Sequence, residues 1–97
     1  ENTMLEVLCQ LLEERPDELK SQVEGVQAIT ALCISKQVAI FIDKSARYKA
    51  TLKCARGFLQ NFVKSGSYNS DYSKEKVQEV LSASAPGRLQ GDKCIVM

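Results

Sequence analysis

The side chains of this sequence that are best suited to covalent or metal chemistry are four cysteines, because the chain contains no histidine. Histidine is the commonest general base and the commonest metal ligand, so a nucleophilic thiol here lacks its usual partner. Neither a Cys-x-x-Cys pair nor another zinc-type spacing occurs, and we expect no metal and no cofactor. Glu13 and Glu14 would point about 100° apart on a helix, which predicts a solvated face rather than a pair of catalytic carboxylates. We therefore expect no catalytic residues and no independent enzyme activity.

Three of the cysteines, Cys9, Cys33 and Cys54, are spaced among apolar residues at helical intervals. A free cysteine in such surroundings behaves as a small hydrophobic residue. The chain is not rich in cysteine, so we expect these thiols to be reduced and the protein to be cytosolic.

The fourth cysteine, Cys94, stands fourth from the end of the sequence and is followed by Ile95, Val96 and Met97. This ending resembles a CaaX box, the C-terminal signal of prenylated proteins. The resemblance implies that the Cys94 thiolate takes an isoprenoid, that a prenyltransferase reads the three residues after it, and that Met97 directs a farnesyl group. It also implies removal of those three residues and methylation of the new carboxylate at Cys94.

A single short lipid chain binds membranes only marginally and reversibly, so stable attachment needs a second signal. One candidate is a protein partner of unknown identity. The other is a basic face on the third predicted helix, formed by Lys49, Lys53, Arg56 and Lys64, which an anionic membrane surface would attract. Without such a signal we expect exchange between membrane and cytosol, with a prenyl-binding carrier as escort. The net charge of +1 and the lack of a recognition motif argue against nucleic acid as a partner.

The composition fits one small domain, with 44% hydrophobic and 26% charged residues in a chain of 97. No stretch approaches the ~18 apolar residues that a membrane-spanning helix requires. Because the sequence begins at Glu1 rather than Met, we expect residues 1–85 to be the C-terminal helical domain of a longer protein. We expect residues 86–97 to be a flexible tail that carries the CaaX-like box.

Apolar residues recur at helical intervals in four segments. The first starts at a capping box, Thr3 to Glu6, and ends near Arg15, because a residue before proline is pushed out of the α region. The second begins at Pro16 and breaks near residues 34–36.

The third segment is the longest and runs from about Gln37 to Lys64, with Gly66 as its stop signal. Ser73 is the predicted cap of a short fourth helix, which frays over residues 82–84. An alternative remains open, because residues 38–42 are β-rich and residues 48–54 alternate between apolar and polar types. In that case a central pair of strands around residues 38–54 would make the domain α+β.

We predict an all-α domain, a small four-helix bundle. The predicted core consists of the apolar residues that face inward on these helices: Leu5, Leu8, Leu12, Leu19, Val23, Val26, Ile29, Phe41, Ile42, Tyr48, Leu52, Leu59, Phe62, Val77 and Leu81.

Charge is distributed unevenly along the chain. Residues 1–35 carry seven acidic and two basic side chains, whereas residues 36–66 carry seven basic and one acidic. This pattern predicts either complementary packing of the early helices against the third or a basic surface for an acidic partner. The expected function is a protein-interaction domain with a farnesyl anchor that places it on membranes as a peripheral protein. The alternatives are a structural capping or dimerisation bundle, or a regulatory C-terminal domain of an enzyme, each with an unmodified tail.

Overall fold

A computed structural model describes residues 3–66 and 69–85, and within these ranges the chain forms five helices and no strand. The helices are α1 (Thr3–Glu14), α2 (Leu19–Leu32), α3 (Lys36–Lys44), α4 (Ala46–Ser65) and α5 (Lys74–Ala83). The all-α prediction is confirmed. The α+β alternative is wrong, because residues 38–54 are helical except for Ser45.

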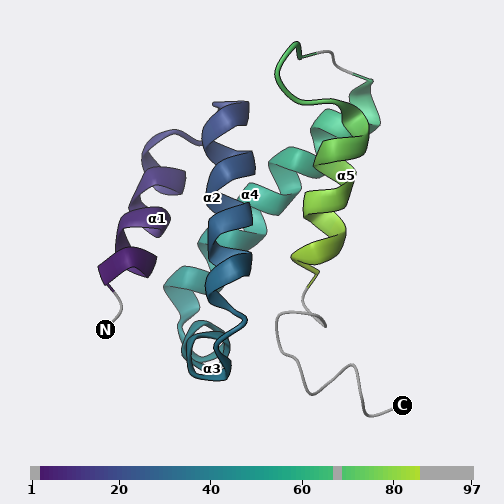
Figure 1. The fold of residues 1–97 in the computed structure, drawn as a ribbon. Coiled ribbons are helices and arrows are strands. Elements are labelled where there is room, and N and C mark those ends of the chain that lie inside the picture. The colour runs from purple at the N-terminus through teal and green to yellow at the C-terminus, as the bar shows by residue number, and fades with distance from the viewer. Residues whose placement is uncertain (1–2, 67–68, 86–97) are drawn as a thin grey trace.

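The longest helix, α4, is the structural centre of the bundle, because it contacts each of the other four helices. Figure 1 shows α4 crossing behind α2 and α5, while α2 lies between α1 and α5 and the short α3 closes the lower end. Helices α1, α2, α4 and α5 therefore make the predicted bundle of four, and α3 is an additional short helix.

The predicted third helix is wrong as a single element, because it is interrupted at Ser45. This residue has an extended backbone (φ −100°, ψ 115°) and both ends α3 and begins α4. Its hydroxyl accepts a hydrogen bond from the Tyr48 amide at 3.2 Å, which is the usual role of serine as an N-cap. The bend turns α3 so that Ile42 and Leu52, on either side of it, are both buried against the same core.

The other helix ends follow local sequence signals. Gly66 adopts a left-handed conformation (φ 71°) at the end of α4, as predicted. Ser73 caps α5 by accepting a hydrogen bond from the Lys76 amide at 3.1 Å, which confirms the predicted start of that helix. The second helix begins later than predicted, at Leu19, because Pro16 lies in a turn instead of in the first helical turn.

Most of the predicted core is confirmed as buried, and the exceptions are informative. Phe41 is 40% exposed, because α3 turns Ile42 inward and leaves its neighbour at the edge, with the Phe41 ring 5.6 Å from that of Tyr48. Five predicted core residues are only half-buried and pack around the centre: Leu8, Leu19, Tyr48, Phe62 and Leu81. Three buried hydrophobic residues of the described chain were absent from the predicted core: Cys9, Ala55 and Val80.

The three cysteines of the helical region have different environments, although the sequence predicts similar ones. Cys9 is buried and Cys33 is half-buried, but Cys54 is exposed on α4. All three thiols are free. Position on an apolar helix segment therefore did not decide burial, because Cys54 lies on the outer side of α4, next to the buried Ala55.

Gln22 is a buried polar side chain that joins α1 to α2. It is 2% exposed, and its amide donates hydrogen bonds to the carbonyl oxygens of Arg15 (2.8 Å) and Leu12 (3.3 Å). These carbonyls belong to the C-terminal end of α1, where backbone acceptors lack partners within the helix. Gln22 therefore stabilises the α1–α2 turn in the way that a capping residue would.

Candidate functional site

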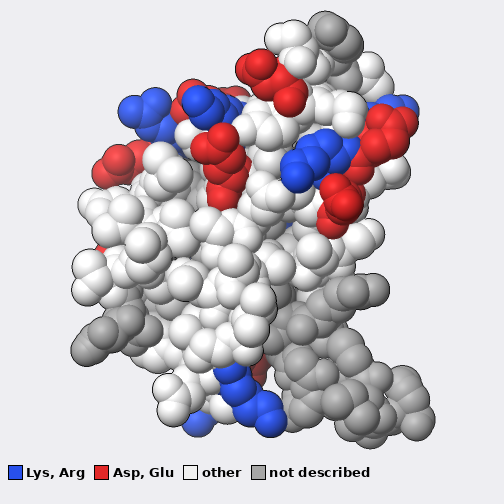
Figure 2. Space-filling view, in the orientation of Figure 1, with Lys and Arg blue, Asp and Glu red and all other residues white. Residues whose placement is uncertain are grey.

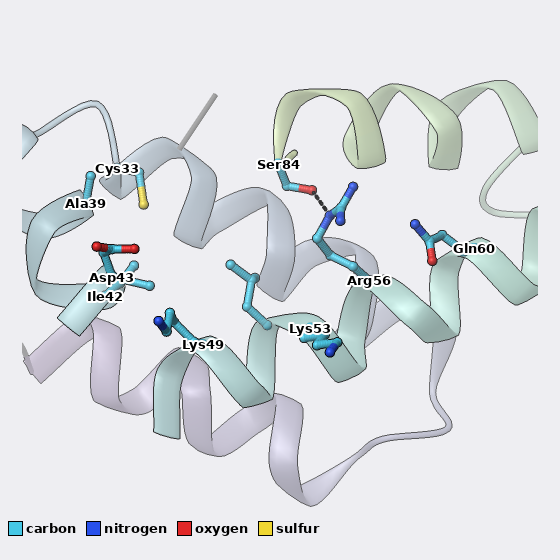
Figure 3. Close-up of a pocket in the computed structure, with 10 residues that line it drawn as sticks. Cys33, Ala39, Ile42, Asp43, Lys49, Lys53, Arg56, Gln60 and Ser84 are labelled. Atoms are coloured by element: carbon cyan, nitrogen blue, oxygen red, sulfur yellow. Dashed lines mark hydrogen bonds between the residues drawn. The ribbon is translucent and has the colours of Figure 1, made fainter. Parts of the chain in front are cut away.

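A groove lies where the C-terminal end of α2, the helices α3 and α4, and the end of α5 come together. Its volume is about 500 Å³. Figure 3 shows side chains from all of these elements pointing into one space, including Cys33 after α2, Asp43 on α3, and Ser84 after α5. Residues more than fifty positions apart in the sequence thus form one concave surface.

The inner part of the groove is apolar. Ile42 from α3 and Leu52 from α4 are both buried core residues that also face the groove, and Ala39 and Cys33 extend this surface. Burial raises the pKa of the Cys33 thiol, so the group stays protonated at neutral pH and behaves as an apolar side chain. The groove therefore offers a contact surface for hydrocarbon.

The side of the groove formed by α4 carries three cations: Lys49, Lys53 and Arg56. Arg56 is half-buried and fixed in place, because its Nε donates to Ser84 Oγ and its Nη2 donates to the Leu81 carbonyl oxygen, each at 3.0 Å. Asp43 is the acidic residue on the groove wall and has an interaction of its own. Three positive groups and one negative group therefore face the same space.

The four residues of the predicted basic face do not lie at one site. Lys49, Lys53 and Arg56 lie together along the groove, at spacings of four and three residues on α4. Lys64 is exposed in the last turn of α4 and does not line the groove, and a cation there interacts favourably with the carbonyl end of the helix. Sequence reasoning found the cations but missed the apolar surface that they border.

A second cluster of charged residues joins α1 to α4. The guanidinium of Arg47 binds two carboxylates, with Nη2 2.8 Å from Glu13 Oε1, Nε 3.0 Å from Glu13 Oε2, and Nη1 2.9 Å from Glu6 Oε2. Tyr48 also donates to Glu6 at 2.7 Å, and Thr51 donates to Glu13 at 2.9 Å. Acidic α1 therefore packs against the basic start of α4, which confirms complementary packing as one use of the uneven charge.

These contacts change the acidity of the two carboxyl groups. Hydrogen bonds from Arg47 and Thr51 lower the pKa of Glu13 from 4.5 to about 2. Hydrogen bonds from Tyr48 and Arg47 also lower the pKa of Glu6. Both carboxylates are thus ionised at neutral pH and engaged in holding α1 and α4 together.

Replacing Arg47 by alanine is expected to make the free energy of unfolding less dependent on pH in the acidic range. In the parent protein the depressed pKa of Glu13 contributes stability above its ordinary value of 4.5, and that contribution is lost as pH falls towards about 2. The variant should be less stable at pH 7, and the difference from the parent should shrink over that interval. Thermal unfolding measured from pH 7 to pH 2 checks this.

Arg15→Ala is the matched control for Arg47→Ala, because Arg15 pairs with Glu18 at 3.2 Å within one turn and joins no two helices. The control should shift the unfolding midpoint less than Arg47→Ala does at pH 7. Parallel pH profiles for Arg47→Ala and the parent would contradict the assigned role.

Surface charge elsewhere is gathered at the edges of one face of the molecule. Figure 2 shows acidic and basic side chains at the upper edge of the bundle and basic ones at the lower edge, while the middle of this face carries few charges. Among the large apolar side chains that are exposed, three lie within eight residues of one another, at the turn between α2 and α3 and on α3: Ile34, Ile40 and Phe41.

The predicted lipid-attachment site and its recognition residues, Cys94 and Ile95, Val96 and Met97, lie outside the described residues. The described chain ends at Ala85, one residue beyond Ser84 in the groove wall. Within residues 3–66 and 69–85, no three His, Cys, Asp or Glu side chains converge as metal ligands would.

Comparison with known proteins gives no relative from which a function could be inferred. No protein-family model matches the chain, and no curated protein or solved structure is significantly similar to it. Across the same described ranges, no single helix is long and apolar enough to cross a membrane; α2 and α3 reach that length and composition only as a pair, bent by 119° between them.

Proposed function

We propose that this chain is a non-catalytic, helical protein-interaction domain that a farnesyl group on Cys94 attaches reversibly to membranes. The observation that carries the proposal is the placement of Cys94 fourth from the end, before two aliphatic residues and Met97. The protein would be cytoplasmic when it is not bound to a membrane. Its enzyme partner would be a prenyltransferase, and a prenyl-binding carrier would shield the lipid in the cytosol.

The attachment reaction uses the thiol of Cys94 and farnesyl diphosphate. The Cys94 Sγ forms a thioether bond to C1 of the farnesyl chain, the bond from C1 to the diphosphate oxygen breaks, and diphosphate leaves with its electron pair. The thiol proton passes to solvent. Hydrolysis of the peptide bond after Cys94 then releases Ile95, Val96 and Met97 and leaves a carboxylate on Cys94. Transfer of a methyl group from a methyl donor to that carboxylate removes the negative charge from the end that meets the membrane.

The position of the cationic residues supports a second, electrostatic contribution to membrane binding. Lys49 and Lys53 are exposed on α4, in the groove whose wall also contains Ser84. Eight residues lie between Ala85 and Cys94, and the nine Cα-to-Cα steps have a contour length of about 30 Å when extended, so the lipid can reach a bilayer that these lysines face. Each lysine near an anionic bilayer is worth about 1 kcal/mol, which supplements the marginal affinity of one lipid chain.

The exposed apolar residues at the α2–α3 turn support the interaction part of the proposal. Ile34 is 88% exposed, Ile40 is 49% exposed and Phe41 is 40% exposed, and all three lie near the short α3. Grouped apolar side chains on a surface favour protein contact more than scattered ones do.

The test is fractionation of cells that express the full chain or its Cys94→Ser variant. We expect the membrane share of the parent to fall to the background level in the variant, because the thioether cannot form. Cys54→Ser is the matched control, since it removes an exposed thiol from α4 and leaves the C-terminal box intact. The control should distribute as the parent does.

A charge-reversal variant separates the lipid from the electrostatic contribution. Lys49→Glu combined with Lys53→Glu should keep the farnesyl group but lose about tenfold or more of its affinity for anionic vesicles. An unchanged membrane share in Cys94→Ser would contradict the anchor. It would then favour a structural capping or dimerisation role, or a regulatory role beside an enzyme domain.

A further inference from the structure

We infer that the groove between α3, α4 and the end of α5 is a binding site for a single-chain anionic amphiphile, a free fatty acid. This goes beyond the proposed function, because every residue that it uses lies in the described part of the chain and none of it depends on Cys94. The hydrocarbon would contact Ile42 and Leu52, and the carboxylate would lie beside Lys53 and Arg56.

The size and walls of the groove suit a hydrocarbon chain. Its volume of about 500 Å³ falls within the range of about 300–1,000 Å³ that is usual for small-ligand sites. Ile42 and Leu52 come from two helices that meet only because of the bend at Ser45, so the apolar surface is concave rather than a flat helix face. Cys33, with its pKa raised by burial, adds a neutral thiol to the same wall.

The charges fix the chemistry of the head group. Arg56 is already oriented by Ser84 and the Leu81 carbonyl, yet a guanidinium has five N–H donors, and these two bonds occupy only two of them. Lys53 lies one turn before Arg56 and Lys49 one turn before Lys53, while Asp43 is the acidic residue on the wall. The excess of positive charge favours an anion over a neutral or cationic head group.

The arrangement also favours a fatty acid over a nucleotide. Leu52 and the cations lie on the same α4 segment, and Ile42 faces the groove from α3. A ligand must therefore present a hydrocarbon chain with a charge at one end. A nucleotide would leave Ile42 and Leu52 facing its polar groups, and burial of polar groups without partners is unfavourable.

The experiment is a titration of the full chain, as Cys94→Ser to exclude lipidation, with dodecanoate at pH 7 below its micellar concentration. Backbone amide shifts in the nuclear magnetic resonance spectrum locate the ligand. We expect shifts at groove residues, and binding about tenfold tighter for dodecanoate than for dodecanol or dodecylamine, since a hydrogen-bonded charge is worth that much.

Two variants and one control test the residues. Lys53→Glu should weaken dodecanoate binding about tenfold, and Ala39→Phe should abolish it by filling the apolar part of the groove. Lys20→Glu makes the same charge change on an exposed part of α2 and should change affinity by about twofold or less at physiological salt. Circular dichroism confirms that each variant is folded.

The inference is overturned if dodecanoate fails to bind the full chain. It is equally overturned if dodecanol binds as tightly, or if Lys53→Glu and Lys20→Glu weaken binding to the same extent. Failure of the farnesyl proposal is a separate result, because it is measured by the membrane share of the parent and leaves this titration unchanged.

Discussion

Replacing Leu59 by alanine is expected to lower the free energy of unfolding by about 2–5 kcal/mol. Leu59 is fully buried near the middle of α4, the helix that contacts all the others. The substitution removes three side-chain carbons from water-excluded surroundings and leaves a cavity that the neighbouring helices cannot close without moving. Equilibrium unfolding in guanidinium chloride measures the change, provided that the transition is two-state.

Ile34→Ala is the control for Leu59→Ala, because it also shortens an aliphatic side chain but at a position that is 88% exposed. Its free energy of unfolding should differ from that of the parent by less than about 0.5 kcal/mol. A loss of less than about 1 kcal/mol for Leu59→Ala would show that α4 is not packed at the centre of the bundle.

The second prediction concerns two glycines in helix interiors, which should respond to alanine with opposite signs. A Cβ on Gly25 of α2 would lie 2.6 Å from Leu12 Cδ2 and 3.0 Å from Leu12 Cγ, whereas a Cβ on Gly57 of α4 would meet no atom within 4 Å. Alanine improves helix propensity by about 1 kcal/mol at either site. At Gly25 overpacking costs about 1–3 kcal/mol, so the net effect there is destabilising.

Gly57→Ala should therefore stabilise the protein by about 0.5–1 kcal/mol, and Gly25→Ala should destabilise it, in the same unfolding assay. The coupling of Gly25 to Leu12 is tested by a double-mutant cycle, since Leu12→Ala removes the atoms that clash. The combined variant should be more stable than the sum of the single changes predicts. Additive effects would mean that α1 and α2 are not in close contact at this point.

The fold class could be predicted from the sequence, and so could those helix ends at which a single residue type gives a clear local signal. Gly66 ends α4 because it tolerates a left-handed backbone, and Ser73 begins α5 because its hydroxyl accepts an amide hydrogen bond. Ser45 carries the same chemistry as Ser73 but lies inside a continuous apolar stripe. The stripe predicted one long helix. The chain bends at Ser45 instead, because the bend allows Ile42 to pack against the core.

The burial of a side chain could be predicted only where the predicted helix had the correct bounds and orientation. Phe41 was placed in the core because the pattern treated residues 37–64 as straight, and the bend at Ser45 left it at the edge. Cys54 was grouped with Cys9 for the same reason, since a pattern of apolar neighbours does not say which side of α4 faces inward. Small residues such as Ala55 gave too weak a signal to be chosen.

The groove could not have been predicted, because its walls come from four elements that the sequence does not relate to one another. The lysines of α4 were visible as a charge pattern, but their position beside Ile42 depends on the bend at Ser45, and Ser84 reaches them only through the packing of α5 on α4. The partners of Arg47 could not be predicted from the sequence for the same reason. The excess of acid in α1 and of base in α4 predicted pairing in general, while the choice of Glu6 and Glu13 required the helix-crossing geometry.

The mass of the C-terminal peptide, from protein isolated from its native cells, shows whether Cys94 carries a lipid. We expect a peptide that ends at Cys94 as a methyl ester, with a farnesyl group on sulfur and without Ile95, Val96 and Met97. A peptide that ends at unmodified Met97, or one whose sequence continues beyond it, would contradict farnesylation of this chain.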